Sequence, residues 1–226
     1  MRFQDAAKDG RAVVYAGIQA EPVVARAASL LADATPTQRV LARAVMNGET
    51  TDSAGWMSMF PTLFGPDGAD GPERTRSEAI LATSLEVADR GEQVRSQVRG
   101  AIVEALTAIL LERRAAQGAV RRERRILFDG VRAEIHPYDV TVERDGAAEA
   151  YDCKWGARGI NADVLHQLDD ARQHAAEEDE PLKVGLVIFD AERSCRVRLE
   201  RQTAPTAAIE LIALETLDRL VGGTPR

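Results

Sequence analysis

Two carboxylates and a lysine stand in the middle of the chain with a spacing that suits phosphate chemistry. Asp139 is followed, after twelve residues, by the tripeptide Asp152-Cys153-Lys154. Hard divalent cations such as Mg²⁺ prefer carboxylate oxygens, and Mg²⁺ keeps several waters for a substrate phosphate. A lysine beside such a cation can hold a phosphate or orient a water nucleophile. The residue types therefore predict a metal-dependent site that acts on phosphate esters.

A β hairpin is expected to bring these residues together. Two runs of alternating side chains flank Asp145-Gly146, a dipeptide that favours a type I′ turn because both turn positions need positive φ. With these two residues as the loop, Arg144 pairs with Ala147, and the same register places Asp139 opposite Asp152. Directly opposed like charges repel, so this pair favours a cation between the carboxylates.

The two faces of the hairpin differ in character because side chains alternate along each strand. One face is predicted to carry Asp139, Thr141, Asp152 and Lys154. The other face is predicted to be apolar and to carry Tyr138, Val140, Val142, Tyr151, Cys153 and Trp155. Cys153 is therefore expected to be buried.

The pattern of Asp139 and Asp152-Cys153-Lys154 resembles the PD-(D/E)xK nuclease superfamily, which has the restriction-endonuclease-like fold. Members share a helix, then a β hairpin with the acidic residue and the (D/E)xK tripeptide, then a helix and a buried strand. Residues 93–220 match that order, a little over half of the chain. In two respects the chain departs from the family pattern: proline stands two positions before Asp139 instead of one, and the tripeptide begins with Asp instead of the commoner Glu.

The resemblance implies a role for each residue of the motif. Asp139 and Asp152 would be metal ligands, Lys154 the catalytic lysine, and the backbone carbonyl of Cys153 a further metal contact. Glu104 on the preceding helix matches the glutamate that completes the metal site in many members. The residues alone also allow a simpler interpretation, in which Asp152 and Lys154 are an exposed pair on a solvated sheet face and Glu104 is an ordinary surface glutamate.

The function implied by the resemblance is a nuclease that depends on Mg²⁺, or on Mn²⁺, and hydrolyses DNA phosphodiester bonds. An endonuclease of restriction, phage defence or repair is expected, and RNA stays open as a substrate. The alternative is a non-catalytic nucleic-acid-binding or assembly subunit that retains the nuclease fold. The net charge of −7 favours this alternative, because nucleic-acid-binding surfaces are usually basic.

The expected fold is α/β, with a restriction-endonuclease-like core of helix, hairpin, helix, strand and helix behind a helical N-terminal extension. Residues 1–88 are assigned to the extension and residues 89–226 to the nuclease domain. In the extension, helices are expected over 22–34 and from Thr35, a cap followed by Pro and Gln, to about residue 46. In the core, a helix is expected from Asn161 to about 178, a buried strand over 183–189, a short strand over 195–199, and a closing helix over about 206–220.

Composition limits the setting. The 226 residues are 45% hydrophobic, which is ordinary for a globular protein, and no apolar run is long enough to span a bilayer. With two cysteines and no signal-peptide pattern, a cytoplasmic protein without membrane partners is expected. The N-terminal helices and an apolar patch over residues 56–64 are candidates for a homodimer contact, or for binding a partner protein or activator.

Overall fold

The chain forms two compact units in the computed structural model, which describes residues 1–6, 10–48, 52–129, 131–132, 136–144, 146–204 and 209–222. One unit comprises Met1–Gly10 and Thr107–Arg226 and is built on a β-sheet, and the other, Arg11–Leu106, is helical. The division falls inside helix α7 (Glu92–Glu112). This division by contacts assigns no role, so the division into an extension (1–88) and a nuclease domain (89–226) stays a prediction.

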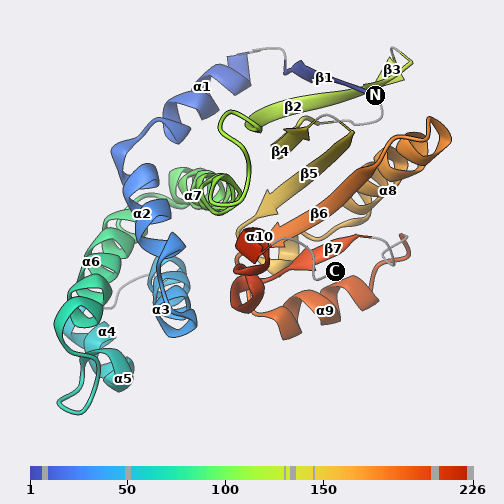
Figure 1. The fold of residues 1–226 in the computed structure, drawn as a ribbon. Coiled ribbons are helices and arrows are strands. Elements are labelled where there is room, and N and C mark those ends of the chain that lie inside the picture. Colours follow the sequence, from blue (N-terminus) through green and yellow to red (C-terminus); the bar gives the residue numbers. More distant parts are fainter. Residues whose placement is uncertain are drawn as a thin grey trace. The chain divides into compact units, whose positions relative to one another are not determined.

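The first unit is α/β, with a mixed sheet in the strand order β1-β2-β4-β5-β6-β7 and β3 beside β2 (Figure 1). Pairing is antiparallel from β1 to β5 and parallel from β5 through β6 to β7. The strands are β1 (Arg2–Asp5), β2 (Val120–Phe128), β3 (Val131–Arg132), β4 (Tyr138–Arg144), β5 (Ala147–Lys154), β6 (Leu182–Ile188) and β7 (Glu210–Ile212).

The hairpin of β4 and β5 has the register that the turn signal predicts. Arg144 pairs with Ala147, and the ladder continues to Val140 and Tyr151. Gly146 has a φ of 76°, a left-handed conformation that glycine adopts without steric cost. The other turn residue, Asp145, lies outside the described residues.

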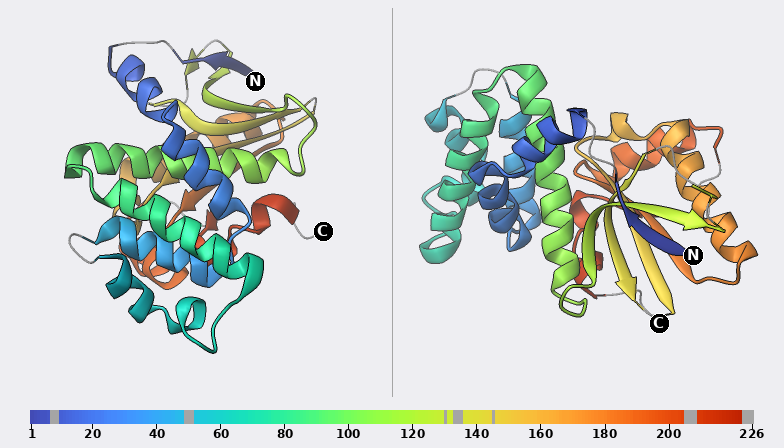
Figure 2. Two further views of the ribbon diagram at one scale, coloured as in Figure 1. Left: turned by 90° about the vertical axis from the view of Figure 1, so that its left-hand side faces the viewer. Right: turned by 90° about the horizontal axis from the view of Figure 1, so that it is seen from above.

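Helices flank the sheet of this unit, and α8 (Ala162–Glu177) runs along β6 (Figures 1 and 2). The predicted cap of α8 is confirmed, because the Asn161 side chain accepts the backbone N–H of Val164 at 3.0 Å. One buried cluster joins α8 to the sheet, including Leu165 and Leu168 from the helix. The remaining helical elements of the unit are η1 (Ala157–Gly159), α9 (Glu192–Glu200), η2 (Leu214–Thr216) and α10 (Arg219–Gly222).

Two predictions about secondary structure are wrong. The alternation of Cys195, Val197 and Leu199 predicted a strand, yet these residues lie in α9, where Cys195 is fully buried and Val197 is 40% exposed. A closing helix over 206–220 is replaced by β7, η2 and α10, with 205–208 outside the described residues. The N-terminal stretch is mostly helical, as predicted, and it also contributes β1, whose pairing with β2 is a long-range contact that local periodicity does not report.

The second unit is helical, and both α2 (Pro22–Ala32) and α3 (Pro36–Asn47) pack against α6 (Gly71–Ala88). The predicted helix start at Thr35 is confirmed as a capping box: Gln38 N donates to Thr35 Oγ1 at 3.3 Å, and Thr35 N donates to Gln38 Oε1 at 2.9 Å. The other helices are α1 (Gly10–Gln19), α4 (Ser53–Met59), α5 (Pro61–Phe64) and the first part of α7.

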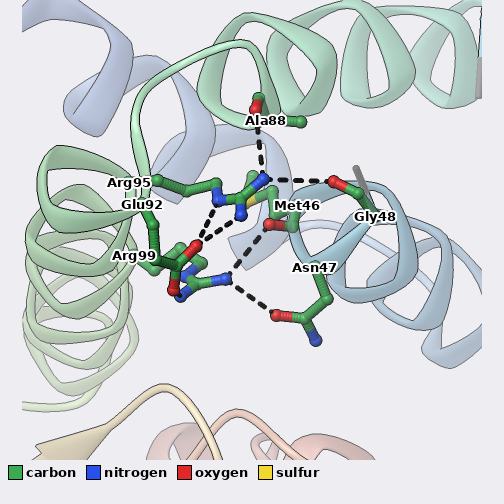
Figure 3. Close-up of polar contacts among 7 residues, drawn as sticks. All are labelled: Met46, Asn47, Gly48, Ala88, Glu92, Arg95 and Arg99. Carbon is green, nitrogen blue, oxygen red and sulfur yellow. Dashed lines mark hydrogen bonds and ion pairs between the residues drawn. The ribbon is translucent and has the colours of Figure 1, made fainter. Parts of the chain in front are cut away.

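Two arginines at the start of α7 hold the ends of neighbouring helices in this unit (Figure 3). Arg95 and Arg99 donate to backbone carbonyls that lie at the C-terminal ends of α3 and α6, where helical carbonyls lack intrahelical partners. The acceptors are the carbonyl oxygens of Met46, Gly48 and Ala88, each at 3.2 Å. Glu92 pairs with both guanidinium groups, so the three charged side chains fasten α7 to α3 and α6.

Among the described residues, no helix is both long enough and apolar enough to cross a membrane.

Candidate active site

The structure brings Asp139, Asp152 and Lys154 together at one end of the hairpin. The Lys154 ammonium contacts Asp152 Oδ1, and its Nζ lies 4.0 Å from Asp139 Oδ2. Asp139 is near the start of β4, while Asp152 and Lys154 close β5. Asp152 is only 7% exposed, so it is not the solvated surface residue of the simpler interpretation. The predicted grouping of these three side chains is therefore present.

The sequence register implied that the two carboxylates lie directly opposite each other, and in the structure they do not. The β4–β5 ladder ends at Val140 and Tyr151, one pair before Asp139 would meet Asp152. The Asp139 carboxylate instead accepts the backbone N–H of Cys153 at 2.6 Å. A side-chain oxygen thus takes the place of a backbone acceptor at the end of the ladder, and this charge-assisted bond fixes the orientation of the Asp139 carboxylate.

The Lys154 ammonium compensates part of the negative charge at the site. Burial lowers the pKa of the Lys154 ammonium, but the charges of Asp139 and Asp152 outweigh burial and hold this pKa above its usual value. Lys154 is therefore positively charged at neutral pH. A lysine in this state donates protons in hydrogen bonds and attracts anions, and it does not act as a general base.

The aliphatic stem of Lys154 rests against the turn η1. A Cβ added to Gly159 would lie 2.8 Å from both Cβ and Cγ of Lys154, closer than side-chain atoms approach. Glycine at 159 therefore leaves the room that the Lys154 side chain occupies.

The backbone carbonyl of Lys154 accepts the N–H of Phe189 at 2.9 Å, and the Phe189 ring stacks on Trp155 with a centroid distance of 4.9 Å.

Four residues of the predicted apolar face are buried: Val140, Val142, Tyr151 and Cys153. Cys153 is buried, and its Sγ lies 3.4 Å from the Thr107 hydroxyl in the last turns of α7. Tyr138 was expected on the same face, but it packs in the cluster with α8, where its hydroxyl donates to the Gln167 carbonyl at 3.2 Å. Strict alternation fails here because β4 joins the ladder with β5 only from Val140 onward, and Tyr138 comes before that point.

Gln167 also holds the chain that leads into β4. Its Nε2 donates to the carbonyl of His136 at 3.0 Å, and its Oε1 accepts the His136 N–H at 3.3 Å. The side-chain amide therefore pairs with both backbone groups of one residue, as a neighbouring strand would, three residues before Asp139. His136 itself is exposed.

Glu104 belongs to the helical unit, whereas the other three residues belong to the unit built on the sheet. It is 5% exposed, so the interpretation as an ordinary surface glutamate is wrong. Its carboxylate accepts hydrogen bonds from the Tyr15 hydroxyl and from Gln19 Nε2, the latter at 2.8 Å, and both donors belong to α1. A role for Glu104 as a metal ligand stays a prediction.

Residues 113–125, which precede the hairpin, are rich in arginine, and some of these arginines form ion pairs within the sheet unit. Arg114 donates to both carboxylate oxygens of Glu149, at 2.8 and 2.6 Å, and to the Leu220 carbonyl at 2.6 Å. Arg124 pairs with Glu143. Arg121 and Arg122 are exposed.

The side chains that could hold a metal ion suit Mg²⁺ better than Zn²⁺. Within the described ranges, no group of three or more His, Cys, Asp or Glu side chains could enclose a metal ion. Mg²⁺ needs less, because proteins commonly hold it through one or two carboxylates while waters and substrate phosphates complete the octahedron. Asp139 and Asp152 fit this requirement, whereas a closed zinc site with four protein ligands does not fit.

Sequence reasoning missed two residues of this region, Gly159 and Asp190. Asp190 is the second residue after β6, and its carboxylate accepts the backbone N–H groups of Ala157 at 3.0 Å and Ala191 at 2.7 Å. Its place after a buried strand was a usable signal, since ligand sites of α/β sheets lie at the carboxyl ends of parallel strands.

Comparisons of the chain with protein-family models, with curated proteins and with solved structures find no match.

Proposed function

We propose that the chain is a Mg²⁺-dependent nuclease that hydrolyses DNA phosphodiester bonds at Asp139, Asp152 and Lys154. The observation that carries the proposal is the Lys154 ammonium held against Asp152 and 4.0 Å from Asp139 at the end of the hairpin. Two carboxylates and a fixed cation meet the needs of a site that binds both a metal ion and a phosphate.

The order of elements supports a restriction-endonuclease-like core within the α/β unit. Helix α7 precedes the hairpin of β4 and β5, and α8 and the buried strand β6 follow. This is the order of the superfamily that the motif resembles. The parallel pairing of β5 with β6 also places Lys154 at the carboxyl end of a central strand.

Each residue has a separate task in the proposed reaction. A bound Mg²⁺ or Mn²⁺ would supply Lewis acidity and a water of lowered pKa. Asp139 and Asp152 would hold this ion, and the backbone N–H of Cys153 keeps the Asp139 carboxylate in place. The Lys154 ammonium would bind a phosphoryl oxygen and stabilise the negative charge that develops there. Its contacts with both carboxylates in the metal-free chain hold it where a phosphate would arrive.

The choice of DNA, endonucleolytic cleavage, a role in restriction, phage defence or repair, and action in the cytoplasm all follow the family resemblance. A homodimer, or a partner that binds the helical unit, is part of the same proposal. The helical unit offers exposed apolar side chains for such a contact, including Val13, Val14 and Met59.

A non-catalytic binding or assembly subunit is the second candidate. The observation in its favour is that the Lys154 ammonium pairs with both carboxylates and compensates one of their two negative charges without a metal ion. Under this alternative the cluster would be a buried structural ion pair.

Cleavage of supercoiled plasmid and of single-stranded DNA, with Mg²⁺, with Mn²⁺ and with EDTA, separates the two candidates. The proposal expects cleavage that requires the metal ion and is lost in Asp152→Asn. Mn²⁺ binding, followed by electron paramagnetic resonance, should weaken in the same variant. A native protein that neither cuts DNA or RNA nor binds Mn²⁺ would leave the non-catalytic subunit as the better reading.

A further inference from the structure

We propose that Asp190 is a positioning residue for Lys154, and that it acts through the short turn η1. The proposal rests on the proposed function for the importance of Lys154, while its geometry stands independently. Asp190 does not belong to the motif that predicts the site. All of its contacts described here lie within the unit that contains the sheet.

Asp190 ties together the segments that follow three parallel strands. Its Oδ2 accepts the N–H of Ala157 after β5, and its Oδ1 accepts the N–H of Ala191 after β6, at 3.0 and 2.7 Å. Its backbone carbonyl accepts the N–H of Leu214 after β7 at 3.1 Å. Asp190 is 7% exposed, and a buried carboxylate is stable only when its oxygens are hydrogen-bonded. Asp190 therefore links the three segments that leave the carboxyl edge of the sheet.

The link from Asp190 to the lysine is short. Ala157 is the first residue of η1, and Gly159 is the last. The backbone of Gly159 lies so close to the Lys154 stem that a Cβ there would be 2.8 Å from Lys154 Cγ. A displacement of η1 therefore displaces the backbone surface against which the Lys154 stem packs.

The backbone of Lys154 is fixed from the other side. Its carbonyl accepts the N–H of Phe189, which directly precedes Asp190. With its backbone held by β6 and its stem held by η1, the side chain is directed to Asp152. Since both carboxylate oxygens of Asp190 accept backbone amides, Asp190 acts on the ammonium through the chain and not by contact.

Three variants and one control test this route. Asp190→Asn keeps the size of the side chain but presents an amide NH₂ to one of the two backbone donors. Gly159→Ala pushes directly on the Lys154 stem. Ala157→Pro removes only the N–H that Asp190 binds. Proline suits the first position of a helical turn, and Gly156 before it is already extended, with φ −144° and ψ 160°.

Glu215→Gln is the matched control. Glu215 Oε2 accepts the N–H of Glu192 at 2.9 Å, so it supports the start of α9 as Asp190 does. Among the described residues, the hydrogen bond of Glu215 goes to α9 and not to η1.

Lysine-selective ¹⁵N labelling reads the position of the ammonium without any need for nuclease activity. The chain has only three lysines, Lys8, Lys154 and Lys183, and Lys154→Arg assigns the signal. In the metal-free native protein, the paired Lys154 ammonium should give a protected signal. This signal should shift or vanish in the three variants, while the signal of Lys183, which pairs with Glu210 at 2.7 Å, stays unchanged.

The outcomes separate this proposal from the proposed function. A Lys154 signal that is unchanged in Asp190→Asn and Ala157→Pro, with the Lys183 signal retained, overturns the positioning role. An equal change in Glu215→Gln overturns it as well, because the effect would then come from α9. If the native protein also cuts DNA, kcat should fall roughly 100-fold in Asp190→Asn at unchanged KM, as expected for a misplaced catalytic group. If the native protein does not cut DNA, a shifted Lys154 signal still supports the positioning role while the proposed function fails.

Discussion

Replacing Lys154 with methionine should destabilise the metal-free protein. Methionine keeps an unbranched stem that can rest against Gly159 but removes the ammonium between Asp139 and Asp152. Two carboxylates are then left near each other, and Asp152 is buried. An unpaired buried charge costs free energy, and a like charge nearby adds to that cost.

The magnitude follows from the separation and the burial. At the 4.0 Å between Lys154 Nζ and Asp139 Oδ2, the gross attraction of one pair is about 4 kcal/mol at an effective dielectric constant of about 20. The energy of removing the charges from water offsets much of this attraction. The Lys154 side chain is 31% exposed in the folded protein, so solvent weakens the attraction further. We therefore expect a net loss of about 1–3 kcal/mol in the free energy of unfolding.

Urea unfolding in EDTA at pH 7 measures this loss. The pKa of Lys154 is raised in the folded state, so its contribution is fully present below the unfolded value of about 10.4 and is lost as the pH rises through the folded pKa. A double-mutant cycle with Asp152→Asn isolates the pair, and a coupling energy of about 0.5–3 kcal/mol is expected. Added Mg²⁺ should stabilise Lys154→Met more than the native protein, because it replaces the missing positive charge.

One result would refute this reasoning. If Lys154→Met is as stable as the native protein and the cycle gives no coupling, the ammonium does not compensate the carboxylates as the geometry requires.

Three further perturbations probe the surroundings of the site. In protein labelled with ¹⁵N-cysteine, the amide proton of Cys153 should lie far downfield because it donates to a carboxylate, and Asp139→Asn should move it upfield and lower the melting temperature. Burial raises the pKa of Glu149, but the bonds from Arg114 outweigh burial and lower it. The stability from this pair is thus present above the unfolded pKa of about 4.3 and lost as the pH falls through the folded pKa. In urea unfolding, the free energy of unfolding of Glu149→Gln should therefore fall less steeply with decreasing pH in the acid range than that of the native protein. Gly185→Ala would place a Cβ 2.6 Å from the ring of Tyr151 on β5, and it should lower the free energy of unfolding by about 1–3 kcal/mol in the same assay.

Local signals in the sequence predicted the hairpin and the grouping of the site residues. The Asp145-Gly146 turn and the alternation of the flanking runs determine the register, which the pairing of Arg144 with Ala147 confirms. The caps at Thr35 and Asn161 were also predictable, because each cap involves residues within three positions.

Features that depend on distant segments could not be predicted in this way. The residues of β4 that precede Val140 lie outside the ladder with β5, and this goes with contacts from Gln167 on α8, about thirty residues away in the chain. The role of Asp190 depends on the parallel alignment of β5 and β6, which no local pattern reports. The stretch from Cys195 to Leu199 fits both a strand and one face of a helix, and tertiary packing selects the helix.

The most direct test of the central claim compares two lysines in one cleavage assay. Lys154→Ala and Lys183→Ala each remove an ion-paired lysine, the first from the site and the second from β6, where Lys183 pairs with Glu210. With Mg²⁺ or Mn²⁺ and plasmid or single-stranded DNA, the native protein and Lys183→Ala should cut while Lys154→Ala should not. Cleavage that survives in pure Lys154→Ala at the native rate would contradict the assignment of Lys154 as the catalytic lysine.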